Sequence, residues 1–168
     1  LVSMAKLVED LEETRSAVTQ AASVLNNKPE TDNAGAGLRP RFQGMITFDN
    51  VRFTYPGSRN PALNGVSFEV PAGTMLGLVG RSGSGKSTIT RLLQGINREY
   101  EGTIKIDGAD LREINLAHLR RSFGVVLQDN FLFRGSIREN LLAGRPGLTI
   151  TDAVRAARLA GAEEFIER

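Results

Sequence analysis

The sequence predicts an α/β fold in which a small antiparallel β subdomain and an N-terminal helix accompany the α/β core. Three observations predict it. A glycine-rich turn at residues 80–88 lies between an apolar run typical of a buried strand, residues 74–79, and residues 89–96, whose apolar side chains recur at helical spacing. Alternating apolar side chains before this turn indicate paired strands. Amphipathic spacing over residues 1–28 indicates a helix.

The composition is that of an ordinary globular domain. The chain has 168 residues, of which 40% are hydrophobic and 24% are charged. A net charge of +2 gives no support to nucleic acid or membrane lipid as a partner. The sequence has no cysteine, which excludes disulfides and thiolate metal sites, and no apolar run approaches the length of about 20 residues that spans a bilayer. Since the chain starts at Leu1 without methionine and stops inside a helix-like pattern, we expect it to be part of a longer protein.

The N-terminal helix has an apolar residue at the same position of each heptad. These residues are Met4, Leu11, Val18 and Leu25. The spacing leaves two interpretations open: an amphipathic helix that docks on its own domain, and a helix that enters from a membrane-embedded part outside this sequence. Spacing alone favours the first. Residues 29–44 are expected to be a linker, because prolines and glycines interrupt regular structure there and residues 33–37 have a flexible composition.

Two strands are expected before the glycine-rich turn. Apolar residues alternate from Ile46 to Tyr55, and the alternation slips near Asn50, which suggests a β-bulge. A second alternating run covers residues 66–70. We expect the two strands to form a small antiparallel sheet that packs against the core.

Strand and helix signals alternate in the region after the turn. Residues 103–107 predict a strand that ends in a turn at Asp107-Gly108, and residues 123–127 predict an apolar strand with Gln128 at its carboxyl end. The expected helix starts are Asn115 before residues 116–121, Ser136 in a capping box with Glu139, Thr151 before a helix that ends at Gly161, and Ala162.

Residues 80–88 fit the phosphate-binding pattern G-x-x-x-x-G-K-[ST] at every position. The glycines lack a Cβ atom, so the backbone can wrap round an anion and aim its N–H groups at it. The helix that follows adds free N–H groups and the positive end of its dipole. Lys86 is expected to reach the β- and γ-phosphates of a nucleotide as a point charge. The alternative is a glycine-rich turn with a chance lysine, which fits less well because strand and helix signals flank the pattern.

Four further side chains extend this hypothesis. Ser87 is expected to offer its hydroxyl to Mg²⁺, and Thr88 to place a hydroxyl near the α-phosphate. Tyr55 could stack on adenine, although an aromatic residue at such a place is more often simply packed. Gln128 could contact Mg²⁺ or the attacking water and report the γ-phosphate, although a glutamine at a strand end is usually only solvated.

Together these residues resemble the nucleotide-binding domain of ATP-binding-cassette transporters. Residues 53–56 match the A-loop that stacks on adenine, residues 80–88 match the Walker A motif, and residues 125–129 match the Q-loop. The resemblance covers about residues 42–168 and implies a P-loop NTPase core, incomplete here, with ATP and Mg²⁺ as cofactors. It implies Lys86 and Gln128 as catalytic residues, and Ser87 and Gln128 as metal ligands. The residues implied to bind the cofactor are Tyr55, Gly80, Ser82, Gly83, Ser84, Gly85, Lys86, Ser87 and Thr88.

Finer details resemble exporters whose membrane and nucleotide domains share one chain, above all the type I secretion exporters of the haemolysin group. These details lie in residues 79–88, 124–130 and 159–166. The resemblance implies ATP-driven export of a substrate, with protein or peptide as candidate cargo, at the cytoplasmic face of the bacterial inner membrane. The implied partners are a second nucleotide-binding domain, placed head to tail, and a transmembrane domain of the same chain, with no nucleic acid. The resemblance favours the membrane-linked interpretation of residues 1–28 and makes residues 45–168 the first part of the nucleotide-binding domain.

Several parts of the family pattern lie beyond residue 168: the signature motif, the Walker B aspartate, the catalytic glutamate and the switch histidine. His118 is expected to be an exposed surface residue instead, and Asp107, Asp110 and Asp129 to be turn residues. We expect the 168-residue chain to bind nucleotide weakly at best and not to hydrolyse it. The reason is that its core would lack a central strand and would leave sheet edges unpaired.

Two alternatives to an exporter remain at this point. One is a soluble cassette ATPase, such as a translation or DNA-repair factor, which would not need the helix and linker at residues 1–44. The other is a switch that binds nucleotide without hydrolysing it, which degenerate motifs downstream of Arg168 would indicate.

Overall fold

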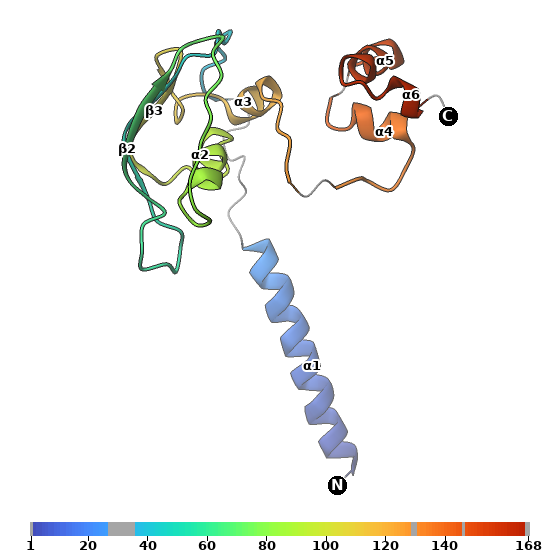
Figure 1. Ribbon diagram of the computed structural model, residues 1–168. Helices are drawn as coiled ribbons and strands as arrows, with labels where there is room; N and C mark the ends of the chain where they lie inside the picture. Colours follow the sequence, from blue (N-terminus) through green and yellow to red (C-terminus); the bar gives the residue numbers. More distant parts are fainter. Residues whose placement is uncertain (1, 27–35, 129–130, 146, 167–168) are drawn as a thin grey trace. The chain divides into compact units, whose positions relative to one another are not determined.

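The computed structural model of the chain describes residues 2–26, 36–128, 131–145 and 147–166. The chain forms two units, Leu1–Gly124 and Val125–Arg168, and each is described by itself. The first unit contains the N-terminal helix and a sheet with two helices, and the second contains three short helices (Figure 1).

Helix α1 spans Val2–Leu25, which confirms the helix expected at the N-terminus. Residues 1, 27 and 28 of that prediction lie outside the described residues. The side chains of Leu11, Val18 and Leu25, which belong to the heptad stripe, are exposed. None of the helices in the described part of the chain combines the length and the apolar character needed to cross a membrane.

The sheet of the first unit has four antiparallel strands in the order β2-β1-β3-β4. Their bounds are Ile46–Phe53 for β1, Leu63–Val70 for β2, Glu101–Ile106 for β3 and Ala109–Asp110 for β4. The expected antiparallel subdomain is therefore confirmed. The expected bulge is confirmed as well, because the register of β1 shifts between Phe48 and Val51 and the backbone of Asn50 has a φ of 46°.

The hydrophobic core of the first unit lies between the sheet and two helices, α2 (Lys86–Leu93) and α3 (Leu116–Ser122). Figure 1 shows α2 beside the sheet. Val51 of β1, Leu92 of α2 and Leu119 of α3 are almost completely buried. Each side chain of this kind contributes about 1.5–3 kcal/mol through its burial. The core therefore holds the start of α2, which carries the phosphate-binding pattern, against the antiparallel sheet.

Two strands predicted from their apolar residues are not strands in the structure. Residues 74–79 and 123–127 have no ladder pairing with any described residue. Most of their side chains are open to solvent, with Met75 99% and Val126 93% exposed, whereas Phe123 packs against the core. A buried strand of a parallel sheet exists only when neighbouring strands satisfy its backbone on both sides. The prediction of these two strands was wrong for the described residues.

The described part of the expected linker, residues 36–44, is held against the rest of the first unit, and residues 29–35 lie outside the described residues. Leu38 forms a bridge with Ile114, and the Asn115 side chain donates to the Ala36 carbonyl over 2.7 Å. His118 lies half-buried with its Nε2 2.7 Å from the Pro40 carbonyl. The expectation of an exposed His118 was wrong, because this segment runs over α3 and covers the ring. Asn115 does cap α3 as expected, since its side chain accepts from the His118 amide over 2.9 Å.

Asp107 holds the end of the linker at the β3–β4 turn. Its carboxylate accepts hydrogen bonds from the amides of Gln43, Gly44 and Met45, the shortest over 2.7 Å. Partial burial opposes ionisation, but these backbone donors outweigh it and hold the pKa of Asp107 below its ordinary value. The expectation of a turn residue is confirmed for Asp107, which in addition acts as a clamp for three successive amides.

Replacing Asp107 by asparagine is expected to lower the free energy of unfolding at pH 7 by about 1 kcal/mol, because one charged acceptor for several amides is lost. The stabilisation from the carboxylate is present above the unfolded-state pKa of about 3.9 and is lost as the pH falls through the lower folded-state value. Urea unfolding of both proteins at several pH values measures this, and the gap between them should close towards pH 2. An equal gap at every pH would contradict the clamp.

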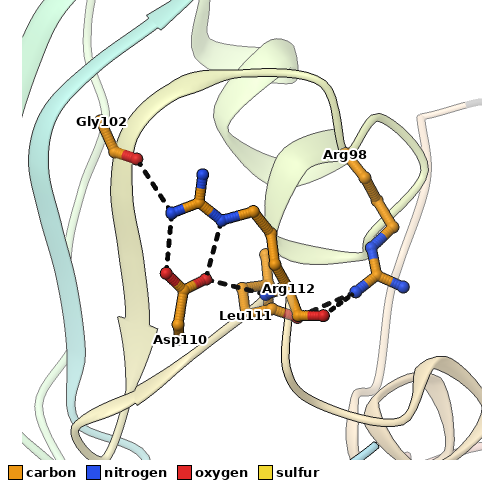
Figure 2. A network of polar contacts seen from close by, with 5 residues as sticks. All are labelled: Arg98, Gly102, Asp110, Leu111 and Arg112. Atoms are coloured by element: carbon orange, nitrogen blue, oxygen red, sulfur yellow. Dashed lines mark hydrogen bonds and ion pairs between the residues drawn. The ribbon is translucent and has the colours of Figure 1, made fainter. Parts of the chain in front are cut away.

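Arg112 closes a polar network beside this turn (Figure 2). Its guanidinium pairs with both carboxylate oxygens of Asp110, the closer at 2.8 Å, and donates to the Gly102 carbonyl over 3.3 Å. The hydrogen bond from Arg112 lowers the pKa of Asp110. Asp110 therefore lies in β4 as one half of an ion pair, which corrects its assignment as a turn residue. Asp129, the third such aspartate, lies outside the described residues.

Tyr100 lies under Arg112, whose guanidinium carbon is 5.2 Å from the ring centre. The tyrosine is only 8% exposed, and its buried hydroxyl has no hydrogen-bond partner among the described residues. Burial, reinforced by the charge of Asp110, raises the pKa of Tyr100 to about 12 despite the nearby arginines.

Replacing Tyr100 by phenylalanine is expected to leave the free energy of unfolding at pH 7 unchanged or raised by about 1 kcal/mol, because an unsatisfied buried hydroxyl is removed. Since the folded-state pKa of Tyr100 is raised, ionisation of this residue does not lower the free energy of unfolding of the wild-type protein below pH 10. The free energy of unfolding falls as the pH rises from 10 towards 12, and the phenylalanine variant lacks this fall because it has no hydroxyl to ionise. Urea midpoints of both proteins between pH 7 and pH 11 measure the difference. A variant that loses stability at pH 7 would show that the hydroxyl has a partner.

The second unit contains α4 (Ile137–Leu142), α5 (Ile150–Leu159) and α6 (Glu163–Ile166). The capping box of Ser136 with Glu139 is confirmed at the start of α4. The cap of α5 is Thr149 rather than Thr151. Thr149 forms a reciprocal pair with Asp152, which satisfies both the helix amide and the cap amide, so the helix begins two residues earlier than predicted.

Candidate nucleotide-binding site

The glycine-rich turn leads directly into α2 through Gly85, whose backbone is left-handed with a φ of 89°. The Gly85 carbonyl accepts from the amides of Thr88 and Ile89 over 3.0 and 3.1 Å, which starts the helix. The amides of Lys86 and Ser87 lie in the first turn of the helix, where no helix carbonyl one turn earlier can accept from them. They also lie at the positive end of the helix dipole. The turn therefore has the geometry of an anion-binding helix start.

Gly85 also rests against the start of β2. A Cβ atom at this position would lie 2.6 Å from the Ala62 carbonyl oxygen and 2.6 Å from the Leu63 Cδ2 atom. Gly80 is confined by its own loop, since a Cβ there would lie 2.7 Å from the Ser84 Oγ. Gly83 needs glycine for a different reason, because its φ is 79° although the space around it is open.

Lys86 folds back over the turn that precedes it. Its Nζ donates to the carbonyls of Gly80 and Arg81, each over 2.8 Å, and to the Ser84 Oγ over 3.3 Å. These contacts hold one positive charge at the glycine-rich turn, beside the amides of the helix start. Ser82 and Ser87 are exposed at the same turn, and the Ser87 hydroxyl is therefore accessible to a ligand from solvent.

Tyr55 follows the end of β1 and reaches the first turn of α2. Its hydroxyl lies 3.2 Å from the Thr88 Oγ1, and its ring stands edge-on to Phe53 with a centroid distance of 4.8 Å and an angle of 82°. The structure thus brings Tyr55 to the phosphate-binding pattern, although 33 positions of sequence separate Tyr55 from Thr88. The ring is half-buried, so it is packed on the core and still accessible.

Gln128 belongs to the second unit and is exposed. The predicted strand before it is irregular in the structure, so no ladder places its side chain. Its role at the nucleotide stays a prediction.

Sequence reasoning did not identify the residues that pack against the glycine-rich turn and the Tyr55 ring. Ala62 and Leu63 lie under Gly85, and Phe53 supports the ring of Tyr55. No sequence signal marks Ala62 or Leu63, because their contact with the turn arises only when β2 packs beside α2. Phe53 could have been found, since it alternates with Tyr55 at the end of a predicted strand.

Comparison with known proteins agrees with this geometry. The family model described as ABC transporter matches residues 63–168, which is more than half of the chain. The chain belongs to the ABC transporter family. This membership confirms the P-loop NTPase fold, here partial, and ATP as the nucleotide that the domain takes.

The relatives of this ABC transporter chain include two leukotoxin exporters. It is 40% identical over 166 residues to the leukotoxin export ATP-binding protein LtxB of Aggregatibacter actinomycetemcomitans. It is 43% identical over 166 residues to the leukotoxin translocation ATP-binding protein LktB of Mannheimia glucosida. Each comparison covers 99% of this chain and 23% of the relative, so the chain spans about a quarter of the length of these relatives.

A solved structure of a bacterial Atm1-family ABC exporter with ATP bound is also similar to this chain. The TM-score is 0.76 and the sequence identity is 36%, over 96% of this chain and 28% of that chain. The resemblance to exporters seen in the motifs is therefore confirmed at the level of both sequence and fold.

Proposed function

We propose that this chain is the ATP-binding part of a membrane exporter of the type I secretion group, which couples ATP binding and hydrolysis to export of a protein or peptide. The observation that carries the proposal is the turn at residues 80–88, whose amides and Lys86 ammonium lie together at the start of α2 and are, in this proposal, the phosphate cradle. The names of the relatives, which are leukotoxin export and translocation proteins, support the exporter over a soluble cassette ATPase.

The residues around the turn fit ATP with Mg²⁺. In this proposal the Lys86 ammonium exchanges its carbonyl partners for the β- and γ-phosphates, and Gly80, Gly83 and Gly85 let the backbone approach them. In this proposal the accessible Ser87 hydroxyl would bind Mg²⁺, with Gln128 of the second unit as the other expected ligand, and the ion would neutralise phosphate charge and polarise the γ-phosphoryl group. Ser82 and Ser84 flank the phosphates, and Tyr55 stacks on adenine.

The partners proposed here follow from the same assignment. A second nucleotide-binding domain closes head to tail over the ATP, and a transmembrane domain of the same polypeptide receives the motion at the cytoplasmic face of the bacterial inner membrane. In this proposal α1 connects from the transmembrane domain, residues 29–44 are the linker, and residues 45–168 are the first part of the nucleotide-binding domain. The hydrogen bonds of residues 36–44 support a linker whose end is attached to the nucleotide-binding part.

The test is a titration of the complete polypeptide that contains this chain with Mg-ATP, followed by ATP-dependent export measured as accumulation of the substrate in the lumen of inside-out membrane vesicles. We expect saturable binding and export that stops without ATP. A complete polypeptide that does not associate with Mg-ATP would overturn the proposal. The purified 168-residue chain is expected to show no turnover, and hydrolysis that depends on Lys86 in this chain would contradict that expectation.

A further inference from the structure

The hydroxyl groups of Tyr55 and Thr88 connect the end of β1 to the first turn of α2, 3.2 Å apart. Thr88 is only 5% exposed, and among the described residues its hydroxyl has the Tyr55 hydroxyl as its hydrogen-bond partner. A buried hydroxyl without a partner is costly, so the position of the tyrosine ring and the satisfaction of Thr88 depend on each other.

We propose that Thr88 is a positioning residue that holds the Tyr55 ring ready for the nucleotide base, so that base and phosphates are recognised as one unit. The inference rests on the proposed function, in which Tyr55 stacks on adenine. Thr88 acts through its side chain on Tyr55, while its backbone belongs to the helix that starts at the phosphate cradle. One residue therefore couples the two halves of the ATP site.

Three contacts define the orientation of Tyr55 before any base arrives. Phe53 stands edge-on to one side of the ring at 4.8 Å, and Thr88 holds the hydroxyl at the far end. The backbone after the ring turns back at once, since the Ser58 amide donates to the Tyr55 carbonyl over 2.9 Å. A ring held at its base, its edge and its tip has lost most of its freedom, so stacking a base on it costs little further ordering entropy.

The first test needs no ligand. The chain has two tyrosines and no tryptophan, so the Tyr100→Phe background leaves Tyr55 as the only tyrosine to emit. In that background we expect Thr88→Val to lower the fluorescence anisotropy of Tyr55 and to raise its quenching by acrylamide about twofold, because the isosteric valine cannot hold the hydroxyl. Thr88→Ser should keep both values near those of the parent.

Circular dichroism checks that the variants keep the fold, and Thr88→Ala replaces Thr88→Val if the valine variant unfolds. Equal anisotropy and equal quenching in the parent and in the variant without the hydroxyl would overturn the proposal.

The second test compares the affinities of the complete polypeptide for Mg-ATP and for Mg-tripolyphosphate, which has no base. Since Thr88 also belongs to the phosphate cradle, the readout is the ratio of the two affinities rather than either value alone. We expect Tyr55→Phe and Thr88→Val each to lower the preference for ATP about three- to tenfold, the effect of one hydrogen bond. The double variant should lose no more than either single variant, because both remove the same contact.

The outcomes separate this inference from the proposed function. If the wild-type protein binds ATP no better than tripolyphosphate, base stacking and hence the proposed role of Tyr55 fails, and the fluorescence test still decides whether Thr88 orders the ring. If ATP is preferred but the ratio is unchanged in both variants, or if the two losses multiply in the double variant, Thr88 does not position Tyr55.

Discussion

Replacing Lys86 by alanine is expected to abolish ATP hydrolysis by the intact protein, with turnover reduced at least about a hundredfold, the usual effect of losing one preorganised donor to a reacting group. The ammonium is held over the turn by two carbonyls at 2.8 Å, so it stands beside the amides that would receive the phosphates. Loss of this charge leaves the β- and γ-phosphates without their positively charged side chain. ATP turnover and Mg-ATP affinity of the complete polypeptide measure the effect.

The matched control for Lys86 is Arg91 in the last turn of the same helix. Arg91→Ala removes one positive charge from α2, but the charge lies at the other end of the helix from the cradle. We expect its turnover to stay within about twofold of wild type, since Arg91 is exposed and the charge of an exposed side chain interacts only weakly through water. Undiminished turnover in Lys86→Ala, or an equal loss in both variants, would rule out the assignment of Lys86.

Replacing Gly85 by alanine is expected to lower the free energy of unfolding by about 2–5 kcal/mol and to remove measurable binding of Mg-ATP. Alanine in the left-handed region costs about 1–2 kcal/mol, and forcing a methyl group into packed structure costs about 1–3 kcal/mol more. The methyl would lie 2.6 Å from the Ala62 carbonyl oxygen, which is backbone and cannot turn away. Relief of the clash would require α2 to move off β2, which would displace the cradle.

Gly73 provides the control for strain without a clash. Its φ is 74°, close to the 89° of Gly85, and nothing lies within 4 Å of a Cβ placed there. Gly73→Ala should therefore cost only the backbone term of about 1–2 kcal/mol and leave nucleotide affinity close to wild type. Urea unfolding and a Mg-ATP titration of both variants measure the difference, and equal losses of stability would show that contact with Ala62 is unimportant.

The phosphate cradle could be predicted from sequence because its parts are neighbours in the chain. The pattern from Gly80 to Thr88 contains the turn, the lysine and the helix start, and no distant residue is needed to form them. Capping boxes are local in the same way, so the start of α4 at Ser136 was correct. The start of α5 was wrong only because two threonines lie near it, and the reciprocal contact with Asp152 selects Thr149.

Other features could not be predicted because they depend on partners far away in the chain. The apolar run at residues 74–79 has the composition of a strand but pairs with no strand among the described residues. Composition alone therefore led to a wrong prediction of a strand there. His118 was misjudged for the opposite reason, since Pro40 covers it from 78 positions away. The clamp of Asp107 on Gln43 spans 64 positions and has no signal beyond a turn aspartate.

The sequence by itself determined the local geometry of the glycine-rich turn, because this turn is built from consecutive amides and one adjacent ammonium group. The tertiary structure alone decided which residues support this turn, through the contact of Gly85 with Ala62 and the hydrogen bond between the hydroxyls of Tyr55 and Thr88. The physical reason is that hydrogen bonds within a turn need only local backbone geometry, whereas contacts between β1, β2 and α2 form only when apolar side chains from all three are buried in one core.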